Sequence, residues 1–184
     1  MVRETLKLKN KDAADVAAVL DAAPELAALA AALAAGQLAL AAGADRVRVA
    51  VALRKLKALW PAAVDVACVL ELCRTPGVVP AATADLAAPA PSAYPNLGAA
   101  DLSGPAPRAV VAKHAALVDA VVAAGLDRVW EAKPRIDGRA LAARMGIQPG
   151  KRIGALLRAQ ADWQVAHPSG TDDELLAHLG TVPE

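Results

Sequence analysis

Apolar residues recur at helical spacing along most of the chain, and caps, Pro and Gly divide the runs into segments. The first part of the chain is expected to hold four helices, near residues 10–23, 24–35, 45–60 and 61–74. Pro24 is assigned to the first turn of the second helix, where a missing backbone N–H is tolerated, and Gly36 is expected to end that helix. No segment alternates apolar and polar residues between hairpin turns, so no strand is predicted.

A change in composition separates this first part from the rest of the chain. Residues 76–106 are rich in Pro and Gly and are interpreted as an irregular linker. Helical spacing resumes after it. The predicted fold class is therefore all-α, with two helical subdomains, residues 1–75 and 107–184, joined by the Pro-rich linker 76–106.

The second part carries clearer start and stop signals than the first. A helix is expected from Pro107 or shortly after to Gly125. Thr171 and Glu174 form the sequence pattern of a capping box, which predicts the start of the last helix. The further helices are expected near residues 138–145, 151–165 and 171–179.

Composition supports a helical protein and argues against a membrane span. Hydrophobic residues make up 56% of the chain and alanine is the most common of them, whereas aromatic residues make up only 2%. Alanine favours helices over strands, and the core must then rely on Leu, Val and three Trp. The Ala- and Leu-rich run 26–40 is interrupted by Gly36 and Gln37, and Ala contributes little transfer free energy, so no membrane partner is expected.

The two cysteines do not form a metal-site pattern. Cys68 and Cys73 lie in an apolar run without the second cysteine pair or the histidines that a zinc site needs. Both are expected to be small core residues, and no metal or other cofactor is predicted. Two unpaired thiols and no signal-peptide pattern indicate a reducing intracellular compartment, with cytoplasm, nucleus and organelle left open.

The net charge of +1 does not by itself indicate a nucleic-acid partner. Two stretches nevertheless concentrate positive charge, residues 46–57 and 128–158. Two interpretations stay open for these stretches, a local phosphate-binding face or solvated faces of helices.

The most informative segment, residues 134–180, has the pattern of a helix, a tight turn and a second helix. Gly146 stands where the first helix must end in a left-handed conformation, and Ile147 is expected to pack back onto it. Gly150, Lys151 and Arg152 open the second helix, whose free backbone N–H groups and dipole favour an anion such as a phosphodiester. The alternative is an ordinary helical hairpin in which the glycines serve only packing.

The same segment resembles the tail region of CCA-adding tRNA nucleotidyltransferases, of the class that includes the eukaryotic enzymes. In that family an ordered pattern of Ile, Gly, Leu, Pro, Trp, Gln and Thr closes the chain. The matching residues are Ile136, Gly138, Leu141, Gly146, Pro149, Gly150, Ile153, Gly154, Trp163, Gln164, Pro168, Gly170 and Thr171. Residues 6–12 and 48–60 resemble the body region of the family more loosely.

The resemblance implies an RNA partner, either tRNA or another structured duplex, held through its phosphates. Few aromatic residues means little base stacking, which fits duplex recognition better than single-strand recognition. The residues expected to contact the RNA backbone are Gly150, Lys151, Arg152, Gly154, Arg139, Arg144 and Arg158.

No catalytic residue is predicted. Two-metal nucleotidyl transfer needs clustered carboxylates on a rigid platform, which the family carries in a head domain that this sequence does not resemble. The acidic run 172–174 falls in the first turn of a helix, where the dipole favours acids. His114, His167 and His178 have no partners at ligand or triad spacing and are expected at the surface or as caps.

The resemblance therefore implies a non-catalytic RNA-binding module without the head and neck of the family. Such a module would be a fragment, a split subunit or a head-less paralogue of an enzyme. An alternative is a structural subunit of a larger RNA–protein assembly such as a ribosome, in contact with protein subunits. A third is a protein-interaction domain without RNA. Affinity for isolated tRNA distinguishes the first from the other two.

Overall fold

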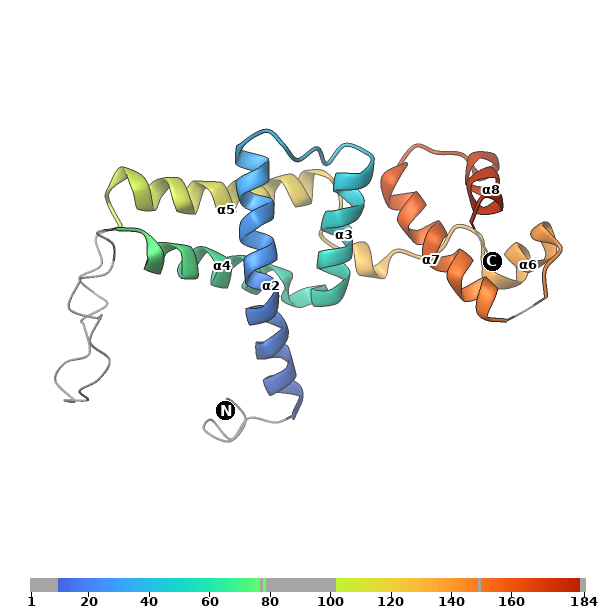
Figure 1. Ribbon diagram of the computed structural model, residues 1–184, viewed down its shortest axis with the longest axis horizontal. Coiled ribbons are helices and arrows are strands. Elements are labelled where there is room, and N and C mark those ends of the chain that lie inside the picture. The colour runs from blue at the N-terminus through green and yellow to red at the C-terminus, as the bar shows by residue number, and fades with distance from the viewer. Residues whose placement is uncertain (1–9, 77, 79–101, 149, 183–184) are drawn as a thin grey trace. The chain divides into compact units, whose positions relative to one another are not determined.

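The structure is a computed structural model, which describes residues 10–76, 78, 102–148 and 150–182 (Figure 1). These residues form α-helices and short 3-10 helices, and no strand is found among them, which confirms the all-α prediction. The expected linker 76–106 falls largely on residues 79–101, outside the described residues. The division into 1–75, 76–106 and 107–184 stays a prediction.

Contacts between Cα atoms group the chain into two compact units that each combine two separate segments. Of the residues that the structure describes, the first unit contains those within 1–37 and 58–120, and the second contains those within 38–57 and 121–184. A basic segment from the first third of the sequence thus packs with the C-terminal helices.

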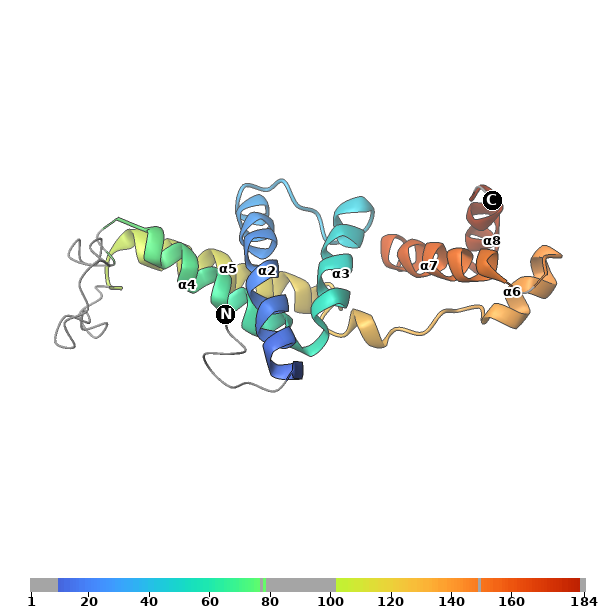
Figure 2. The ribbon, with the colours of Figure 1, turned by 60° about the horizontal axis from the view of Figure 1, so that its bottom comes forward.

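The first unit is built from α2 (Asn10–Ala34), α4 (Trp60–Arg74) and most of α5 (Pro105–Ala123). Helix α2 packs across α4, as Figures 1 and 2 show from two directions. Small residues on both helices are fully buried, which lets the two backbones approach closely. The buried residues of α2 and α4 are Ala23, Leu26, Leu29, Ala30, Trp60, Ala63, Val64 and Ala67.

Pro24 was expected to start a helix, and this expectation is wrong. It lies inside α2, which is continuous over 25 residues. A proline within a helix removes the hydrogen bond to the carbonyl four residues earlier, here that of Leu20. Both Pro24 and Leu20 are solvent-exposed, so water can serve the carbonyl that Pro24 leaves without a partner.

By length and composition, α2 is long and apolar enough to cross a membrane. Its buried residues Ala23, Leu26 and Ala30 are spaced three and four positions apart and therefore share one face of the helix. This face is buried in a unit in which α2 packs against α4.

The cysteine prediction is wrong for Cys73, which is exposed, and Cys68 is only half-buried. The buried face of α4 is set by Ala63, Val64 and Ala67, and the two cysteines lie to the side of it. Burial raises the pKa of the Cys68 thiol, and the nearby carboxylate of Glu71 raises it further.

His114 is buried, with 2% of its surface exposed, whereas a surface or capping position was expected. It continues the buried face of α5 formed by Val110, Leu117 and Val121, so the helical spacing could have revealed it. Its Nδ1 lies 3.0 Å from the carbonyl oxygen of Val110, and its Nε2 lies 3.7 Å from a carboxylate oxygen of Glu71. His167 and His178 are exposed, as expected.

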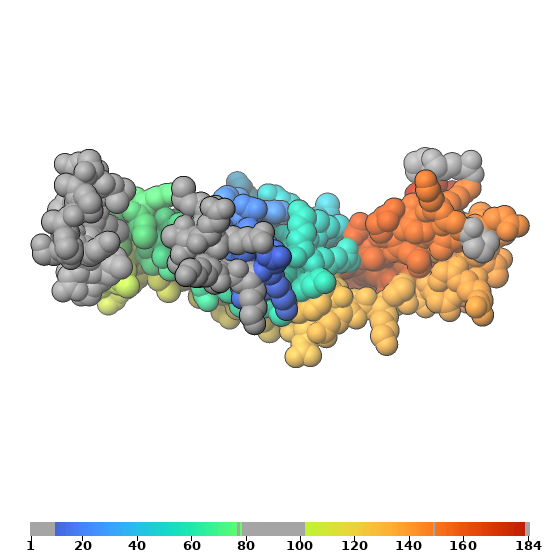
Figure 3. All heavy atoms as spheres, turned by 90° about the horizontal axis from the view of Figure 1, so that it is seen from below, coloured from blue at the N-terminus to red at the C-terminus, as the bar shows by residue number. Residues whose placement is uncertain are grey.

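The second unit is organised around α7 (Lys151–Ala166). Helices α3 (Ala44–Leu56), α6 (Gly138–Met145) and α8 (Asp172–Gly180) all pack against α7, and the 3-10 helix η4 (Val129–Glu131) packs against α3. In Figure 3 the atoms of α6 and α7 form one continuous block. The core of the C-terminal helices consists of Ile136, Leu141, Leu156, Trp163, Leu175 and Leu179.

Three local predictions in this unit are confirmed. Gly146 ends α6 with a left-handed φ of 66°, and Ile147 packs back against the core. Thr171 and Glu174 form a capping box at the start of α8. The hydrogen bonds from the backbone and side chain of Thr171 hold the pKa of Glu174 below its ordinary value.

The expected helix 45–60 ends four residues early. Helix α3 stops at Leu56 because Lys57 takes a φ of 52°, which is not helical, and the 3-10 helix η1 (Lys57–Leu59) follows. The backbone N–H of Lys57 still bonds to the carbonyl of Leu53 and so closes the last turn of α3.

The Trp163 indole is the largest side chain of the C-terminal core and fixes the loop between α7 and α8. It stacks on the imidazole of His167, with the ring centroids 4.7 Å apart. Gly170, near the other end of this loop, packs directly against the indole. A Cβ added there would stand 2.3 Å from the Cη2 of Trp163. Only glycine fits this position without moving the indole.

We expect Gly170→Ala to destabilise the second unit by roughly 1–3 kcal/mol, the usual range for overpacking a core. Urea unfolding followed by the near-ultraviolet circular dichroism of Trp would measure the change. Gly180→Ala is the matched control, since a Cβ there meets no atom within 4 Å. Equal stability of the two variants would contradict the close packing of Gly170 on Trp163.

Candidate functional site

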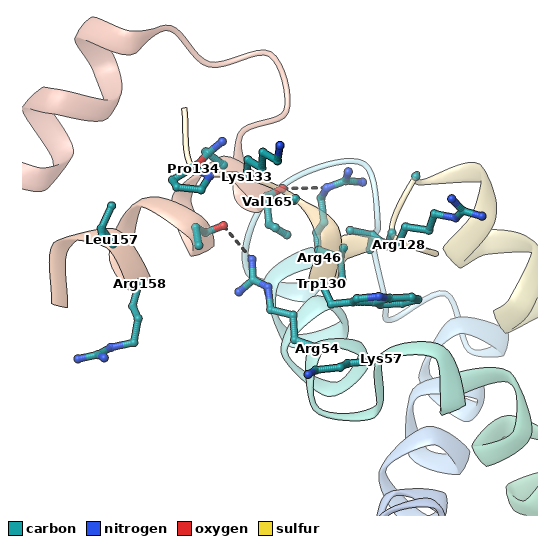
Figure 4. A pocket seen from close by; sticks show the side chains of 16 residues that line it. Arg46, Arg54, Lys57, Arg128, Trp130, Lys133, Pro134, Leu157, Arg158 and Val165 are labelled. Carbon is teal, nitrogen blue, oxygen red and sulfur yellow. Dashed lines mark hydrogen bonds between the residues drawn. The ribbon is translucent and has the colours of Figure 1, made fainter. Parts of the chain in front are cut away.

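The second unit contains a hollow of about 680 Å³, lined by residues of α3, η4, α7 and the segment around Pro134 (Figure 4). We call it the basic hollow, because six cationic side chains line it and no acidic residue is found among the described residues that do so. The two basic stretches of the sequence both contribute to it. The cations are Arg46, Arg54, Lys57, Arg128, Lys133 and Arg158.

Two of these cations serve the fold. The Arg46 Nε donates a hydrogen bond of 2.8 Å to the carbonyl of Val165, and its Nη1 donates one of the same length to the carbonyl of Leu40. Arg54 donates from Nη2 to the carbonyl of Ala161 at 3.0 Å. Figure 4 shows both arginines reaching from α3 to the backbone of α7.

Arg54 also forms an ion pair with Asp162, with 2.5 Å between Nη1 and Oδ1. The carboxylate is 46% exposed, so the ion pair itself contributes little in water. The hydrogen bond from Arg54 to the backbone contributes more to stability, because it ties the end of α3 to the C-terminal part of α7.

The remaining cations leave the basic hollow with an excess of positive charge. Arg128 lies 3.9 Å from a carboxylate oxygen of Glu131, and both side chains are largely exposed. Lys57, Lys133 and Arg158 have no ion-pair partner within the part of the chain that the structure describes. Uncompensated cations around a concave surface attract anions.

The basic hollow also has an apolar wall. Trp130 in η4 is half-buried and lines the hollow together with Pro134 and Leu157. Figure 4 shows Trp130 beside α3, where η4 and α3 pack together. The combination of an aromatic ring with cations can hold a group that is both planar and anionic.

Lys57 occupies a strained backbone position at the edge of the basic hollow. It has a φ of 52° and a ψ of −130°, and among the described residues no other non-glycine residue has a positive φ. Such a conformation costs a side-chain-bearing residue about 1–3 kcal/mol relative to glycine. Strain of this kind is concentrated at functional sites in proteins.

The predicted anion site at the start of α7 is open to solvent. Gly150 occupies the N-cap without a side-chain hydrogen bond to the helix, and Lys151 is exposed beside it. A Cβ added at Gly150 or at Gly154 would meet no atom within 4 Å, and neither glycine has a left-handed φ. The fold therefore requires neither glycine, in contrast to Gly146 and Gly170.

The other predicted residues are divided between two helices. Lys151, Gly154 and Arg158 are spaced three and four positions apart and lie on one face of α7, which we call the α7 stripe. The stripe runs over about 10 Å, at 1.5 Å per residue, from the start of the helix to the basic hollow. Arg139 and Arg144 are exposed on α6 and do not line the hollow, and Arg152 is half-buried.

Sequence reasoning missed Trp130 and Lys57 as members of the site. Trp130 lies between Arg128 and Lys133, a pattern of one aromatic residue among cations that could have been noticed. No sequence signal marks the positive φ of Lys57. Within the described residues, no three His, Cys, Asp or Glu side chains gather into a group that could hold a metal ion.

Comparison with known proteins finds partial relatives. The chain matches no protein-family model and no solved structure. A stretch of 57 residues, 31% of this chain, is 35% identical to the mitochondrial CCA tRNA nucleotidyltransferase of Saccharomyces cerevisiae. A stretch of 69 residues, 38% of this chain, is 25% identical to the tRNA nucleotidyltransferase cca2 of Schizosaccharomyces pombe.

This chain therefore contains a region related to CCA tRNA nucleotidyltransferases. The matched stretches cover only 10% of the Saccharomyces protein and 14% of the Schizosaccharomyces protein. The similarity is thus to a small part of each relative.

We expect Arg54→Ala to destabilise the second unit by about 1–3 kcal/mol, because it removes the hydrogen bond from the charged guanidinium to the carbonyl of Ala161 in α7. Asp162→Asn should cost less than about 1 kcal/mol, since only the exposed ion pair is weakened. Thermal and urea unfolding of both variants would measure the difference. A larger effect of Asp162→Asn than of Arg54→Ala would assign the stabilisation to the ion pair instead.

Proposed function

We propose that this chain binds RNA, either tRNA or a similarly structured duplex, through the phosphate backbone and without catalysing a reaction. It corresponds in this proposal to the C-terminal, tRNA-binding half of a CCA-adding tRNA nucleotidyltransferase of the eukaryotic-like class. The contacts come from the residues predicted from sequence, Gly150, Lys151, Arg152, Gly154, Arg139, Arg144 and Arg158.

The observation that carries the proposal is the free space at Gly150 and Gly154. The packing of the chain explains other glycines of the segment, such as Gly146 and Gly170, but not these two. A glycine in the interior of a helix is unfavourable by up to about 1 kcal/mol relative to alanine. Close approach by another backbone, such as that of a nucleic acid, is a function that only glycine allows.

The charge beside these glycines supports a phosphate partner. Lys151 stands at the start of α7, where the backbone N–H groups and the helix dipole favour an anion. Along the α7 stripe, Arg158 continues the positive charge to the basic hollow. A phosphate chain lying along the stripe would meet positive charge at both ends.

The relatives support tRNA as the RNA. Both are named as tRNA nucleotidyltransferases, and the chain shares a region with each of them. Recognition of an A-form duplex proceeds largely through shape and backbone contacts, which suits a surface of glycines and cations.

The test is binding of labelled full-length tRNA to the whole chain across a salt series, with a Lys151→Ala/Arg152→Ala variant alongside. We expect micromolar or tighter binding at low salt that weakens steeply with salt, because bound cations release counterions from the RNA. The variant should bind more weakly, and its slope against salt should be shallower by about one to two.

A double variant in the first unit, Arg74→Ala/Arg108→Ala, is the control, because it removes the same charge from two exposed positions that do not belong to the unit with the site. If both double variants weakened tRNA binding equally, the loss of affinity would be a result of net charge alone. Absence of binding at low salt would contradict the proposal and favour a structural role in a larger assembly.

Gly154→Ala tests the same surface in the opposite direction. We expect it to stabilise α7 by roughly 0.5–1 kcal/mol, because alanine replaces an interior glycine and its Cβ has free space. The same Cβ should obstruct the RNA backbone and weaken tRNA binding. Unfolding and binding measured on one preparation would show the two effects together, and unchanged tRNA affinity would contradict close approach at this residue.

A further inference from the structure

We propose that the basic hollow holds one unpaired nucleotide of the bound RNA, with its base against Trp130 and its phosphate among Lys57, Lys133 and Arg158. The inference rests on the proposed RNA-binding function and names what one part of that surface takes. Backbone contact along the α7 stripe would place a strand at the edge of the hollow, where Arg158 belongs to both.

The charge of the basic hollow indicates an anionic ligand. After Arg46 and Arg54 have donated to backbone carbonyls, Lys57, Lys133 and Arg158 stay without an ion-pair partner among the described residues. Like charges around one concavity repel one another, and an anion between them removes that repulsion. A phosphate group accepts hydrogen bonds from both Lys and Arg.

Trp130 indicates that the ligand also has a planar, apolar part. Of the three Trp of the chain, Trp60 and Trp163 are buried in the cores, with 5% and 7% of their surfaces exposed. Trp130 is the half-buried one, and it lines the basic hollow together with Leu157. Duplex backbone alone needs no aromatic wall, whereas an unstacked base gains from one.

The size of the basic hollow fits such a ligand. Its volume of about 680 Å³ lies within the range typical of small-molecule pockets, about 300–1,000 Å³. A nucleotide is a small-molecule-sized group with one planar and one charged part, which matches the Trp130 wall and the cations around it.

The strain at Lys57 gives independent support. Its backbone conformation favours glycine, and a glycine would keep the bond from this N–H to the carbonyl of Leu53. The fold alone therefore offers no reason for a lysine at this position. A charged ligand in the basic hollow supplies one, because only the side chain reaches it.

The experiment compares three probes on the whole chain: a short blunt RNA duplex, the same duplex with one unpaired 3′ nucleotide, and adenosine monophosphate. We expect the duplex with the unpaired nucleotide to bind roughly tenfold more tightly than the blunt one, as stacking of one base on an aromatic side chain allows. Fluorescence anisotropy of labelled RNA measures both affinities, and calorimetry measures the mononucleotide.

Three variants assign the preference to the basic hollow. Trp130→Ala should abolish the preference for the unpaired nucleotide and leave binding of the blunt duplex nearly unchanged. Trp130→Phe should keep most of the preference, because the ring is retained. Lys57→Gly should reduce the preference while raising the melting temperature, because it relieves the backbone strain.

The outcomes separate this inference from the proposed function. Equal affinity of the natural chain for both duplexes overturns the inference and leaves RNA binding intact. A second outcome also overturns the inference: Trp130→Ala weakens binding of both duplexes equally, and Lys57→Gly leaves the preference for the unpaired nucleotide unchanged. Trp130 would then serve the fold alone. Binding of neither duplex overturns the proposed function.

If neither duplex binds, the binding of adenosine monophosphate shows whether the basic hollow takes a nucleotide at all. Adenosine monophosphate binding that Trp130→Ala abolishes would support a nucleotide site served by free nucleotide rather than by RNA. Absence of that binding as well would overturn the inference together with the function.

Discussion

The second unit depends on how the C-terminal end of α7 is held. The last carbonyls of a helix have no partner within it, and α7 has no basic residue of its own in its last turn. The missing partners come from the segment before and within α3. The N–H of Gly43 donates to the carbonyl of Ala166 at 2.9 Å, and Arg46 donates to the carbonyl of Val165, 119 positions away in the sequence.

These hydrogen bonds also shape the surface of the second unit. They hold residues 38–57, and with them Lys57, against the C-terminal helices, so that cations from two distant stretches surround one hollow. Part of the positive charge is thereby used to build the fold, and part is left for a ligand. Arg46 and Arg54 belong to the first group, and Lys57, Lys133 and Arg158 belong to the second.

Residues 134–180, from which the resemblance to CCA-adding enzymes was predicted, also combine residues that build the fold with residues that do not. Most of the characteristic residues of this segment are structural, since Ile136, Leu141 and Trp163 form the core, Thr171 caps α8 and Gly170 accommodates the indole. A sequence pattern of this kind thus records mainly how the helices are packed. Two other members, Gly150 and Gly154, have no role in packing, and they lie beside the exposed Lys151.

Local signals predicted the helices of residues 138–180 to within a residue or two, because caps, left-handed glycines and helical spacing act over a few positions. The same reasoning failed at Pro24, whose place inside α2 depends on solvent exposure of one turn, and at Cys73, whose face is set by packing. The seven residues predicted as the site stay a prediction. The basic hollow could not be foreseen, because it depends on hydrogen bonds between segments more than a hundred positions apart.

At two positions of the second unit the residue is not the one that the local backbone conformation favours, and the two departures are opposite in kind. Gly154 is a glycine where a helix favours alanine, and Lys57 is a lysine where the backbone favours glycine. Selection for stability alone would favour alanine in place of Gly154 and glycine in place of Lys57, since each replacement fits the surrounding space. Departures from local preference are expected where a sequence serves function rather than folding. Gly154 lies on the α7 stripe and Lys57 lines the hollow where that stripe ends, so the two exceptions share one surface.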